Sequence, residues 1–328
     1  MKKRVLITGA SGFVGYHLIE AALHDDLDVY VAIRKSSDVS HLKHFDIQYT
    51  YPNFNNLESL KNELQEKQYD YIIHAAGITR ARSAKEYKHI NADYTYNLAL
   101  AAQSAGKKLK GFVFISSLAA VGPLKNLNGI ITEATIPQPI TDYGKSKLLA
   151  EKKLKTIDGL NYTILRPTAV YGPRDTGIFI FFQQLKKGIE PYIGHAEQKL
   201  SFIYVKDLAK TAVKALYKCD ENTYNLSDGN FYDKYELGTI AKNVLNLRAV
   251  KFHLPVNFVK IIASLSEKVG SLRNKAVILN MDKLKELTAA NWYCDIEHAK
   301  QDLGFYPDHD LKAGLTETLN WYKKNKWL

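Results

Sequence analysis

Short apolar runs alternate with helical patterns along the first two-thirds of the chain. Runs of apolar and β-branched positions predict buried strands at residues 4–7, 29–33, 71–75, 112–115 and 162–165. Between them, apolar residues recur at helical spacing over residues 13–23, 57–64, 91–105 and 143–154. This alternation is typical of right-handed strand–helix–strand units. We therefore predict an α/β fold with a doubly wound parallel sheet, the Rossmann architecture.

The pattern loosens after Arg166-Pro167. Residues 203–205 and 223–226 predict short strands on either side of a helix over residues 207–216. From Phe231 onward the segments are mostly helical. We expect a doubly wound domain of residues 1–167 and 203–229, and a smaller, mostly helical C-terminal domain of residues 168–202 and 230–328.

One helical segment, residues 256–269, carries unusually many apolar side chains. Such a helix suits a membrane surface or the cover of a substrate. An ordinary packed helix needs no special role and is the favoured interpretation.

Composition narrows the class of protein. The chain has 328 residues, of which 46% are hydrophobic and 24% charged, so a disordered chain is excluded. No apolar run approaches the ~20 residues that a membrane span needs, and the apolar start after Arg4 stops at Thr8, too early for a signal peptide. Only Cys219 and Cys294 occur, which argues against a disulfide framework and favours the cytoplasm.

The formal net charge is +11. Basic groups such as Lys152-Lys153 and Lys323-Lys324 are interrupted by apolar residues at helical spacing, so solvated helix faces explain them better than a nucleic-acid footprint. A positive field that attracts phosphorylated small ligands fits equally well. We expect a small-molecule partner and no nucleic acid.

A glycine-rich turn follows the first predicted strand and opens the first predicted helix. Gly9 permits a tight turn, Gly12 lets the backbone approach a pyrophosphate, and Gly15 lets the helix pack closely on the sheet. Free N–H groups at the helix start favour phosphate. This context predicts a dinucleotide site, whose contacts are expected from Gly9, Ser11, Gly12, Phe13, Val14 and Gly15.

The residues after the second strand bear on the choice of coenzyme. An acidic residue there would accept a hydrogen bond from a ribose 2′-hydroxyl, but Ile33 is followed by Arg34-Lys35-Ser36-Ser37. A guanidinium with neighbouring hydroxyls suits a 2′-phosphate, so Arg34 predicts NADP. NAD stays open because Asp38 lies close by.

Three residues form a candidate catalytic set. Tyr143 and Lys147 are four residues apart and share one face of a helix. A tyrosine pKa of ~10 must fall toward neutrality for proton exchange, which takes about 4 kcal/mol, and a nearby ammonium favours the phenolate in this way. Ser117, at the carboxyl end of the fourth predicted strand, can hydrogen-bond a reacting carbonyl oxygen.

Together with the G-x-x-G-x-x-G spacing of the turn, further motifs in the same order resemble extended short-chain dehydrogenases/reductases of the NAD(P)-dependent epimerase/dehydratase type. They are His74–Gly77, Asn91 with Asn97-Leu98, Ser116-Ser117, Tyr143–Lys147 with Ala150-Glu151, Leu165–Pro167, Val170–Asp175 and Val205–Ala209. The resemblance implies that Asn91 supports the active site, and that Lys147 binds the nicotinamide ribose. It implies cofactor contacts by Ala75, Ala76, Gly77, Asn91, Ser116, Tyr143, Lys147, Pro167 and Val170. It also implies a homodimer built on the helices that contain Asn91 and Tyr143.

The substrate is less sharply indicated. Ala169 and Leu200 stand where sugar-nucleotide members of the family usually carry Asn and Arg, although Lys199 or Arg174 could substitute. Arg166-Pro167-Thr168 and the segment 201–205 look more like dihydroflavonol-reductase-like and 3β-hydroxysteroid-dehydrogenase-like proteins.

We therefore favour hydride transfer between nicotinamide and a carbonyl or secondary alcohol of a small molecule. The alternatives are a nucleotide-sugar epimerase or dehydratase using bound NAD(P), and a non-catalytic cofactor-sensing protein. Candidate substrate contacts, each of which could instead serve packing or a loop, are Thr79, Arg80, Thr168, Tyr171, Tyr192, His195 and Lys199. His195 has no partner at metal-ligand spacing, so no metal site is expected.

Overall fold

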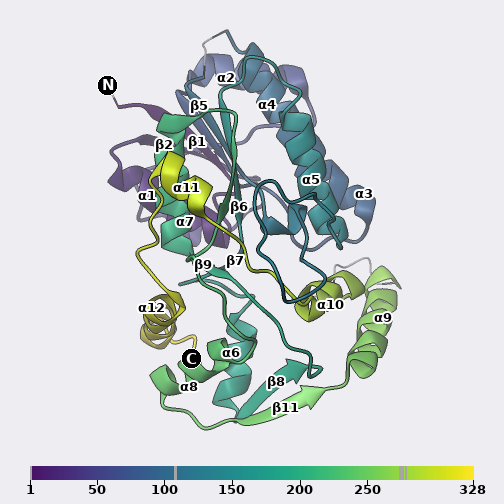
Figure 1. The fold of residues 1–328 in the computed structure, drawn as a ribbon. Coiled ribbons are helices and arrows are strands. Elements are labelled where there is room, and N and C mark those ends of the chain that lie inside the picture. Colours follow the sequence, from purple (N-terminus) through teal and green to yellow (C-terminus); the bar gives the residue numbers. More distant parts are fainter. Residues whose placement is uncertain (1, 107–108, 273–276, 278) are drawn as a thin grey trace.

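A computed structural model describes residues 2–106, 109–272, 277 and 279–328 (Figure 1). Its centre is a seven-stranded, wholly parallel sheet in the order β10-β6-β5-β4-β1-β2-β3, which confirms the predicted doubly wound architecture. The strands are β1 (Arg4–Thr8), β2 (Asp28–Ala32), β3 (Gln48–Thr50), β4 (Tyr71–His74), β5 (Gly111–Ile115), β6 (Tyr162–Pro167) and β10 (Thr223–Leu226).

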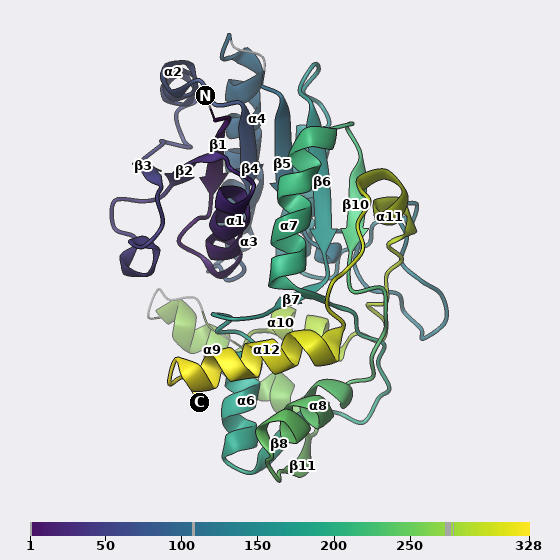
Figure 2. The ribbon, with the colours of Figure 1, turned by 90° about the vertical axis from the view of Figure 1, so that its left-hand side faces the viewer.

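Helices cover both faces of this sheet (Figure 2). Successive residues of a strand point to opposite faces, so neighbouring strand residues pack against different helices. Val5 and Ile7 belong to a core shared with α1 (Phe13–His24), α7 (Val205–Ala215) and α11 (Glu297–Leu303). Leu6, between them in the strand, belongs to a core shared with α2 (Leu57–Lys67), α4 (Tyr94–Ser104) and α5 (Asp142–Leu154). The two faces are therefore separately packed.

Several local features differ from the expected pattern, among them β7 (Ala169–Tyr171), β8 (Ile189–Ile193) and β11 (Val250–Leu254), which were not predicted. Edge strand β3 was not predicted, since Gln48 and Tyr49 are exposed and leave no apolar run. The helix expected over 91–105 begins as a π-helical turn, η2 (Lys88–Asp93), before α4. The strand expected at 203–205 is β9 (Phe202–Tyr204), which pairs with β7 outside the large sheet.

A third hydrophobic core lies below the carboxyl edge of the sheet. There β7 and β9 pack with α6 (Phe179–Lys186), α8 (Glu236–Leu245) and α12 (Leu311–Lys324). A parallel ribbon of β8 and β11 leads into α9 (Val256–Leu272) and α10 (Met281–Thr288). The region after Phe231 is mostly helical, as expected.

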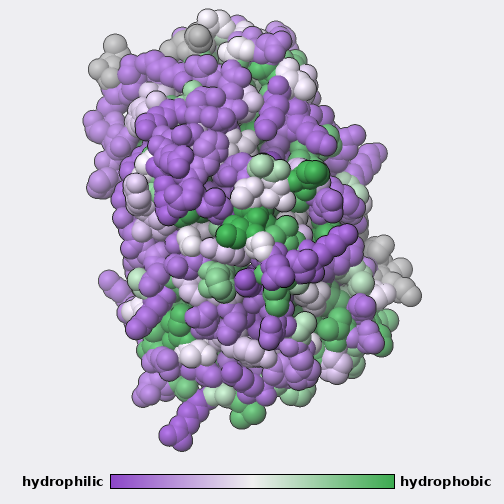
Figure 3. Space-filling view, in the orientation of Figure 1, coloured by the Kyte–Doolittle hydropathy of each residue, from purple (hydrophilic) through white to green (hydrophobic). Residues whose placement is uncertain are grey.

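The surface seen from the side of Figure 1 is largely hydrophilic (Figure 3). Apolar side chains gather near its lower right, in the area that α9 occupies. Within the described part of the chain, no helix combines the length and apolarity required to cross a bilayer.

Candidate active site

The glycine-rich turn has the geometry of a phosphate cradle. Gly9 has φ +70°, and a Cβ placed there would lie 2.6 Å from the Ala75 carbonyl oxygen. A Cβ on Gly15 would lie 2.2 Å from the Gly9 carbonyl oxygen, so both positions require glycine. Gly12 caps α1, and the helix makes its first hydrogen bond from Tyr16 N–H to the Gly12 carbonyl. The N–H groups of the three residues between, Phe13, Val14 and Gly15, precede the helical ladder and fit a pyrophosphate.

A buried histidine holds the end of β4 against this turn. The Thr95 hydroxyl donates to the Asn91 carbonyl (2.7 Å), so it accepts from His74 Nε2–H (2.9 Å). His74 Nδ1 then accepts from the Thr8 hydroxyl (2.8 Å), which itself accepts Ala76 N–H (3.0 Å). Burial and the charge of Lys147 lower the pKa of His74 to about 3, so the ring is neutral. This series of hydrogen bonds fixes the backbone of Ala75–Gly77 beside the cradle.

Ser117 and Tyr143 meet beside the carboxyl edge of the sheet. Ser117 follows β5 and caps a short helix, η3 (Leu118–Ala120), by accepting Ala119 N–H (3.2 Å). Tyr143 lies in the first turn of α5, and the Ser117 side chain acts to lower the pKa of its hydroxyl. A Cβ on Gly144 would lie 2.2 Å from the Ala119 carbonyl oxygen. Only glycine therefore lets the first turn of α5 approach η3 this closely.

Lys147 lies one helical turn further along α5 and is 4% exposed. Its ammonium donates to the Ile115 carbonyl (2.7 Å) and lies 4.5 Å from the centre of the Phe114 ring. Burial lowers the pKa of Lys147 to about 8, while the charge of Glu151 opposes this shift.

The expected lowering of the Tyr143 pKa by Lys147 is not found. Burial raises the pKa of Tyr143 above its usual value, and the contact with Ser117 only partly offsets this effect. The physical reason is that burial disfavours the charged phenolate, while the Lys147 ammonium donates to the backbone carbonyl at the end of β5. In this arrangement Tyr143 keeps its proton at neutral pH.

A buried ion pair underlies the site. Glu151 Oε2 lies 2.6 Å from Arg166 Nη2, and the two side chains are 2% and 6% exposed. Glu151 also accepts the Ser116 hydroxyl, while Ser116 N–H donates to the Leu165 carbonyl (2.8 Å). The Ser116 hydroxyl thus donates to Glu151 in this structure. The role of Glu151 was not predicted. Its spacing of four residues from Lys147 places both side chains on one helix face and could have indicated the interaction.

Asn91 joins the segment after β4 to α5. Its Oδ1 accepts Ile78 N–H (2.8 Å), and its Nδ2 donates to the Ile78 carbonyl (3.0 Å) and the Ser146 hydroxyl (2.9 Å). A Cβ on Gly77 would lie 3.0 Å from Asn91 Oδ1. Asn91 therefore supports the geometry of the site, and the π-helical turn presents it.

Arg34 lies exposed just beyond β2, followed by exposed Lys35 and Ser36. Asp38 is turned to a local task, since its carboxylate accepts Ser40 N–H (2.9 Å) and its pKa is lowered by that bond. This donor set fits a 2′-phosphate. Of the two residues expected beside the nicotinamide, Pro167 ends β6 and Val170 lies partly buried in β7.

The expected substrate residues do not form one group. Thr79 and Arg80 are exposed after β4, and Thr168 is buried at the end of β6. Among the described residues, no hydrogen-bond partner faces the Thr168 hydroxyl. Lys199 lies 4.6 Å from the centre of the Phe231 ring.

The other three expected substrate residues lie in the lower part of the molecule. Tyr171 is 1% exposed in the third core, with its hydroxyl donating to the Asp310 carbonyl (3.2 Å). In the β8–β11 ribbon, the Tyr192 hydroxyl donates to Glu190 (2.6 Å), and His195 stacks on His253 at 4.3 Å. The packing role that the sequence left open accounts for the contacts of Tyr171 and Tyr192.

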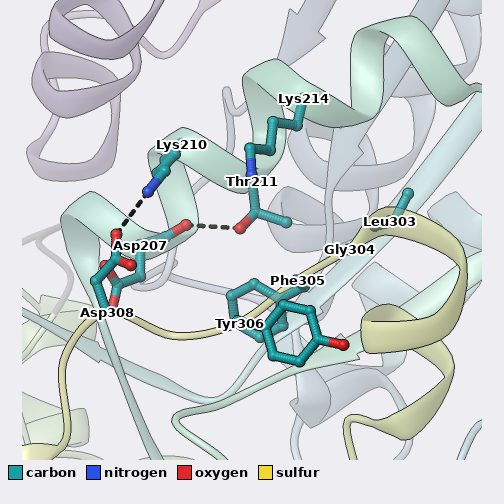
Figure 4. A pocket seen from close by; sticks show the side chains of 9 residues that line it. All are labelled: Asp207, Lys210, Thr211, Lys214, Leu303, Gly304, Phe305, Tyr306 and Asp308. Carbon is teal, nitrogen blue, oxygen red and sulfur yellow. Dashed lines mark hydrogen bonds and ion pairs between the residues drawn. The ribbon is translucent and has the colours of Figure 1, made fainter.

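A small surface pocket lies elsewhere, between α7 and the segment that follows α11 (Figure 4). Lys210 pairs with Asp308 there (2.6 Å), and Phe305 and Tyr306 line one side. It contains none of the candidate catalytic or cofactor residues. Among the residues described, no cluster of His, Cys, Asp or Glu is arranged to hold a metal.

Comparison with known proteins places these features in context. A sequence model of the NAD dependent epimerase/dehydratase family matches residues 5–227. A "Ceramide reductase" of Caulobacter vibrioides is 26% identical over 326 residues, covering 99% of this chain and 96% of the relative. A "UDP-glucose 4-epimerase" of Vibrio cholerae is 28% identical over 332 residues, covering 97% and 95%. A decarboxylating sterol-4-alpha-carboxylate 3-dehydrogenase of Candida albicans is 25% identical over 348 residues, covering 98% of each chain.

Among solved structures, a UDP-glucose 4-epimerase of Thermotoga maritima with UDP-glucose superimposes with a TM-score of 0.81. The two chains share 22% identity, and the match covers 98% of this chain and 99% of that one. The similarity establishes a common fold.

Proposed function

The chain belongs to the NAD-dependent epimerase/dehydratase family, and from that premise we propose that it is an NADP-dependent oxidoreductase acting on a carbonyl or secondary alcohol of an apolar small molecule. One observation carries the proposal. Ser117 follows β5, Tyr143 and Lys147 lie in successive turns of α5, and Lys147 donates to the Ile115 carbonyl at the end of β5, the sheet edge where the phosphate cradle opens. Open α/β sheets bind their ligands at this edge.

The residues that would hold the dinucleotide are distributed along this edge. The N–H groups at the start of α1 take the pyrophosphate, Arg34 takes the 2′-phosphate, and Ala75–Gly77, Pro167 and Val170 line the path to the reactive ring. When bound, the coenzyme supplies or accepts hydride.

The protein's own groups handle the proton. Ser117 donates a hydrogen bond to the carbonyl oxygen, and Tyr143 gives its proton to that oxygen as negative charge develops there. The Tyr143 hydroxyl carries its proton at neutral pH, because burial raises its pKa, so it is available as the donor. Lys147 lies one helical turn further along α5, and the family resemblance assigns its ammonium to the nicotinamide ribose.

Two features support an apolar substrate. Ala169 and Leu200 provide no charge or amide at positions where sugar-nucleotide enzymes usually hold their ligand. Two relatives of the chain are named for a ceramide and a sterol, so we propose a ketone carried by a lipid. In this proposal, residues 168–202 and 230–328 form the substrate-binding domain.

Nucleotide-sugar epimerisation is the second candidate. The 28% identity to the Vibrio cholerae epimerase favours it, and Lys199 or Arg174 could replace the missing charge. A reductase must exchange its coenzyme at every turnover, whereas an epimerase recycles it.

The test measures NADPH oxidation with a panel of long-chain ketones, alongside epimerisation of UDP-sugars. We expect ketone-dependent oxidation, a Tyr143→Phe protein that binds NADPH as the parent does, and a turnover lower by roughly 10²–10⁴-fold. Undiminished turnover in that variant contradicts the mechanism. Epimerised UDP-sugar without net NADPH use establishes the second candidate instead.

The family resemblance also leads us to propose a cytoplasmic homodimer that pairs the outer faces of α4 and α5. Light scattering of the purified protein tests the dimer, and a monomeric mass contradicts it.

A further inference from the structure

Helix α9 turns an apolar stripe toward solvent. Phe258, Ile261, Ile262 and Leu265 are 51%, 59%, 37% and 56% exposed. They follow the i, i+3, i+4, i+7 spacing that places side chains on one helix face. A different side of the helix packs against the protein, where Val259 and Ala263 are buried. The helix therefore packs through Val259 and Ala263, as expected, and the exposed stripe is a second apolar face.

The apolar exposure extends into the ribbon that precedes α9. Val250 and Phe252 of β11 are 76% and 54% exposed, and Ile189 of β8, the register partner of Val250, is 46% exposed. Isolated exposed apolar residues are ordinary on protein surfaces, but a helix stripe preceded by an exposed strand face is not.

The charge pattern indicates what this surface meets. Exposed Arg248, Lys251 and Lys260 are interspersed with these apolar residues, and no Asp or Glu occurs between positions 248 and 266. Exposed Lys186 and Lys187 precede Ile189. An apolar surface interspersed with these cations, on a chain of formal charge +11, is complementary to an anionic lipid surface.

Helix α9 is also connected to the candidate active site. Glu267 of α9 accepts the N–H of Met281, the first residue of α10 (2.8 Å). The next residue, Asp282, accepts Asp142 N–H (2.6 Å) at the start of α5, directly before Tyr143. The exposed stripe is thus two hydrogen-bonded contacts away from the proposed proton donor.

We propose that the stripe of α9, with the exposed edge of β8 and β11, docks on the surface of a bilayer that contains anionic lipid. The inference rests on the proposed function, because a lipid-borne ketone resides in such a bilayer. The helix lies in the interface plane with its apolar stripe in the acyl boundary, and the lysines and arginine meet the lipid phosphates. Docking places α10 and the first turn of α5 next to the membrane that holds the substrate.

Vesicle flotation tests the docking directly. The full chain is mixed with phosphatidylcholine vesicles, with or without phosphatidylglycerol, and the bound fraction is measured at low and high salt. We expect binding to the anionic vesicles that weakens with salt, and at least a tenfold loss of partitioning in a Phe258→Gln/Ile261→Gln/Leu265→Gln variant. These side chains are exposed, so the variant should fold. A Tyr306→Gln variant, which removes a 71% exposed apolar side chain beside the pocket of Figure 4, should bind like the parent.

The readout is independent of turnover, so failure of docking and failure of the proposed function are distinguishable. NADPH oxidation by the parent with a water-soluble ketone and no vesicles tests the proposed function separately, and circular dichroism of the triple variant tests its folding. Equal flotation of parent and triple variant overturns the proposal, as does equal binding to neutral and anionic vesicles. A parent that is dimeric without vesicles and a triple variant that is monomeric also overturn it, since the stripe would then face a second copy of the chain.

Discussion

The buried pair of Glu151 and Arg166 makes a quantitative prediction. In a Glu151→Gln protein, Arg166 keeps its charge but loses the opposite charge and one of its two carboxylate contacts, which are 2.6 Å to Nη2 and 3.0 Å to Nε. Breaking a buried ion pair by removing one partner typically costs about 3–5 kcal/mol, because the remaining charge stays desolvated. Glutamine keeps the shape and one acceptor, so we expect a loss of about 3 kcal/mol.

Thermal unfolding followed by circular dichroism measures this loss. A change of that size lowers Tm by roughly 4 °C in a chain of this length. A matched control is Glu297→Gln, which breaks an ion pair with Lys300 whose side chains are 57% and 30% exposed. Exposed pairs contribute about 0–1 kcal/mol, so the control should melt close to the parent.

The same variant should change the pH dependence of catalysis. Glu151 raises the pKa of Lys147, which burial has lowered to about 8. Without the carboxylate the ammonium loses its proton at lower pH, so the alkaline limb of kcat/KM should move to lower pH. A double Glu151→Gln/Arg166→Met protein removes both charges and should recover most of the stability, but not the pH profile.

Two outcomes would refute this reasoning. The first is a Glu151→Gln protein that melts within about 1 °C of the parent. The second is a double variant whose loss of stability equals the sum of the losses in the two single variants. Such additivity in a double-mutant cycle means that Glu151 and Arg166 do not interact energetically.

Three further predictions concern single residues. Arg34→Gln should lower the preference for NADPH over NADH by about tenfold or more, the value of a charge-assisted hydrogen bond, and an unchanged ratio of kcat/KM for the two coenzymes contradicts the assignment. Gly144→Ala places a Cβ 2.2 Å from the Ala119 carbonyl oxygen and should reduce kcat far more than NADPH affinity; unaltered kcat would show the close approach to be unnecessary. For Lys147, the folded pKa of about 8 lies below the unperturbed 10.5, so the unfolded chain binds more protons between these pH values and stability rises with pH there. Chemical denaturation measures the free energy of unfolding near neutral pH and near pH ~10. In the parent this free energy should rise by up to about 3 kcal/mol between the two pH values, whereas in Lys147→Met it should not. An equal rise in both proteins contradicts the prediction.

Local patterns were enough to predict much of the sheet and its cofactor edge. Each central strand is a continuous apolar run, and each flanking helix has one apolar face, so their types follow from a few neighbouring residues. The turn from Gly9 to Gly15 was predictable for the same reason, since its glycines act on the backbone next to them. Edge strand β3 was missed because an exposed edge requires no apolar run.

The site was only partly predictable. The spacing of Tyr143 and Lys147 follows from helix geometry, and the position of Ser117 follows from the end of a strand. The direction of the Tyr143 pKa shift was not predictable, because it depends on burial by surrounding segments. Tyr171 illustrates the same limit, since an aromatic residue in a family motif can equally contact a ligand or fill a core.

The sequence alone thus determined the alternation of strands and helices in the large sheet and the glycine turn, and it nominated the reacting side chains, since these depend on residues close together in the chain. The tertiary structure alone decided which distant groups meet, such as Asp282 at the start of α5 and Arg166 against Glu151. It also decided that α9 faces outward. Periodicity shows that a helix has an apolar face, but only the packing of all other segments determines whether that face is covered.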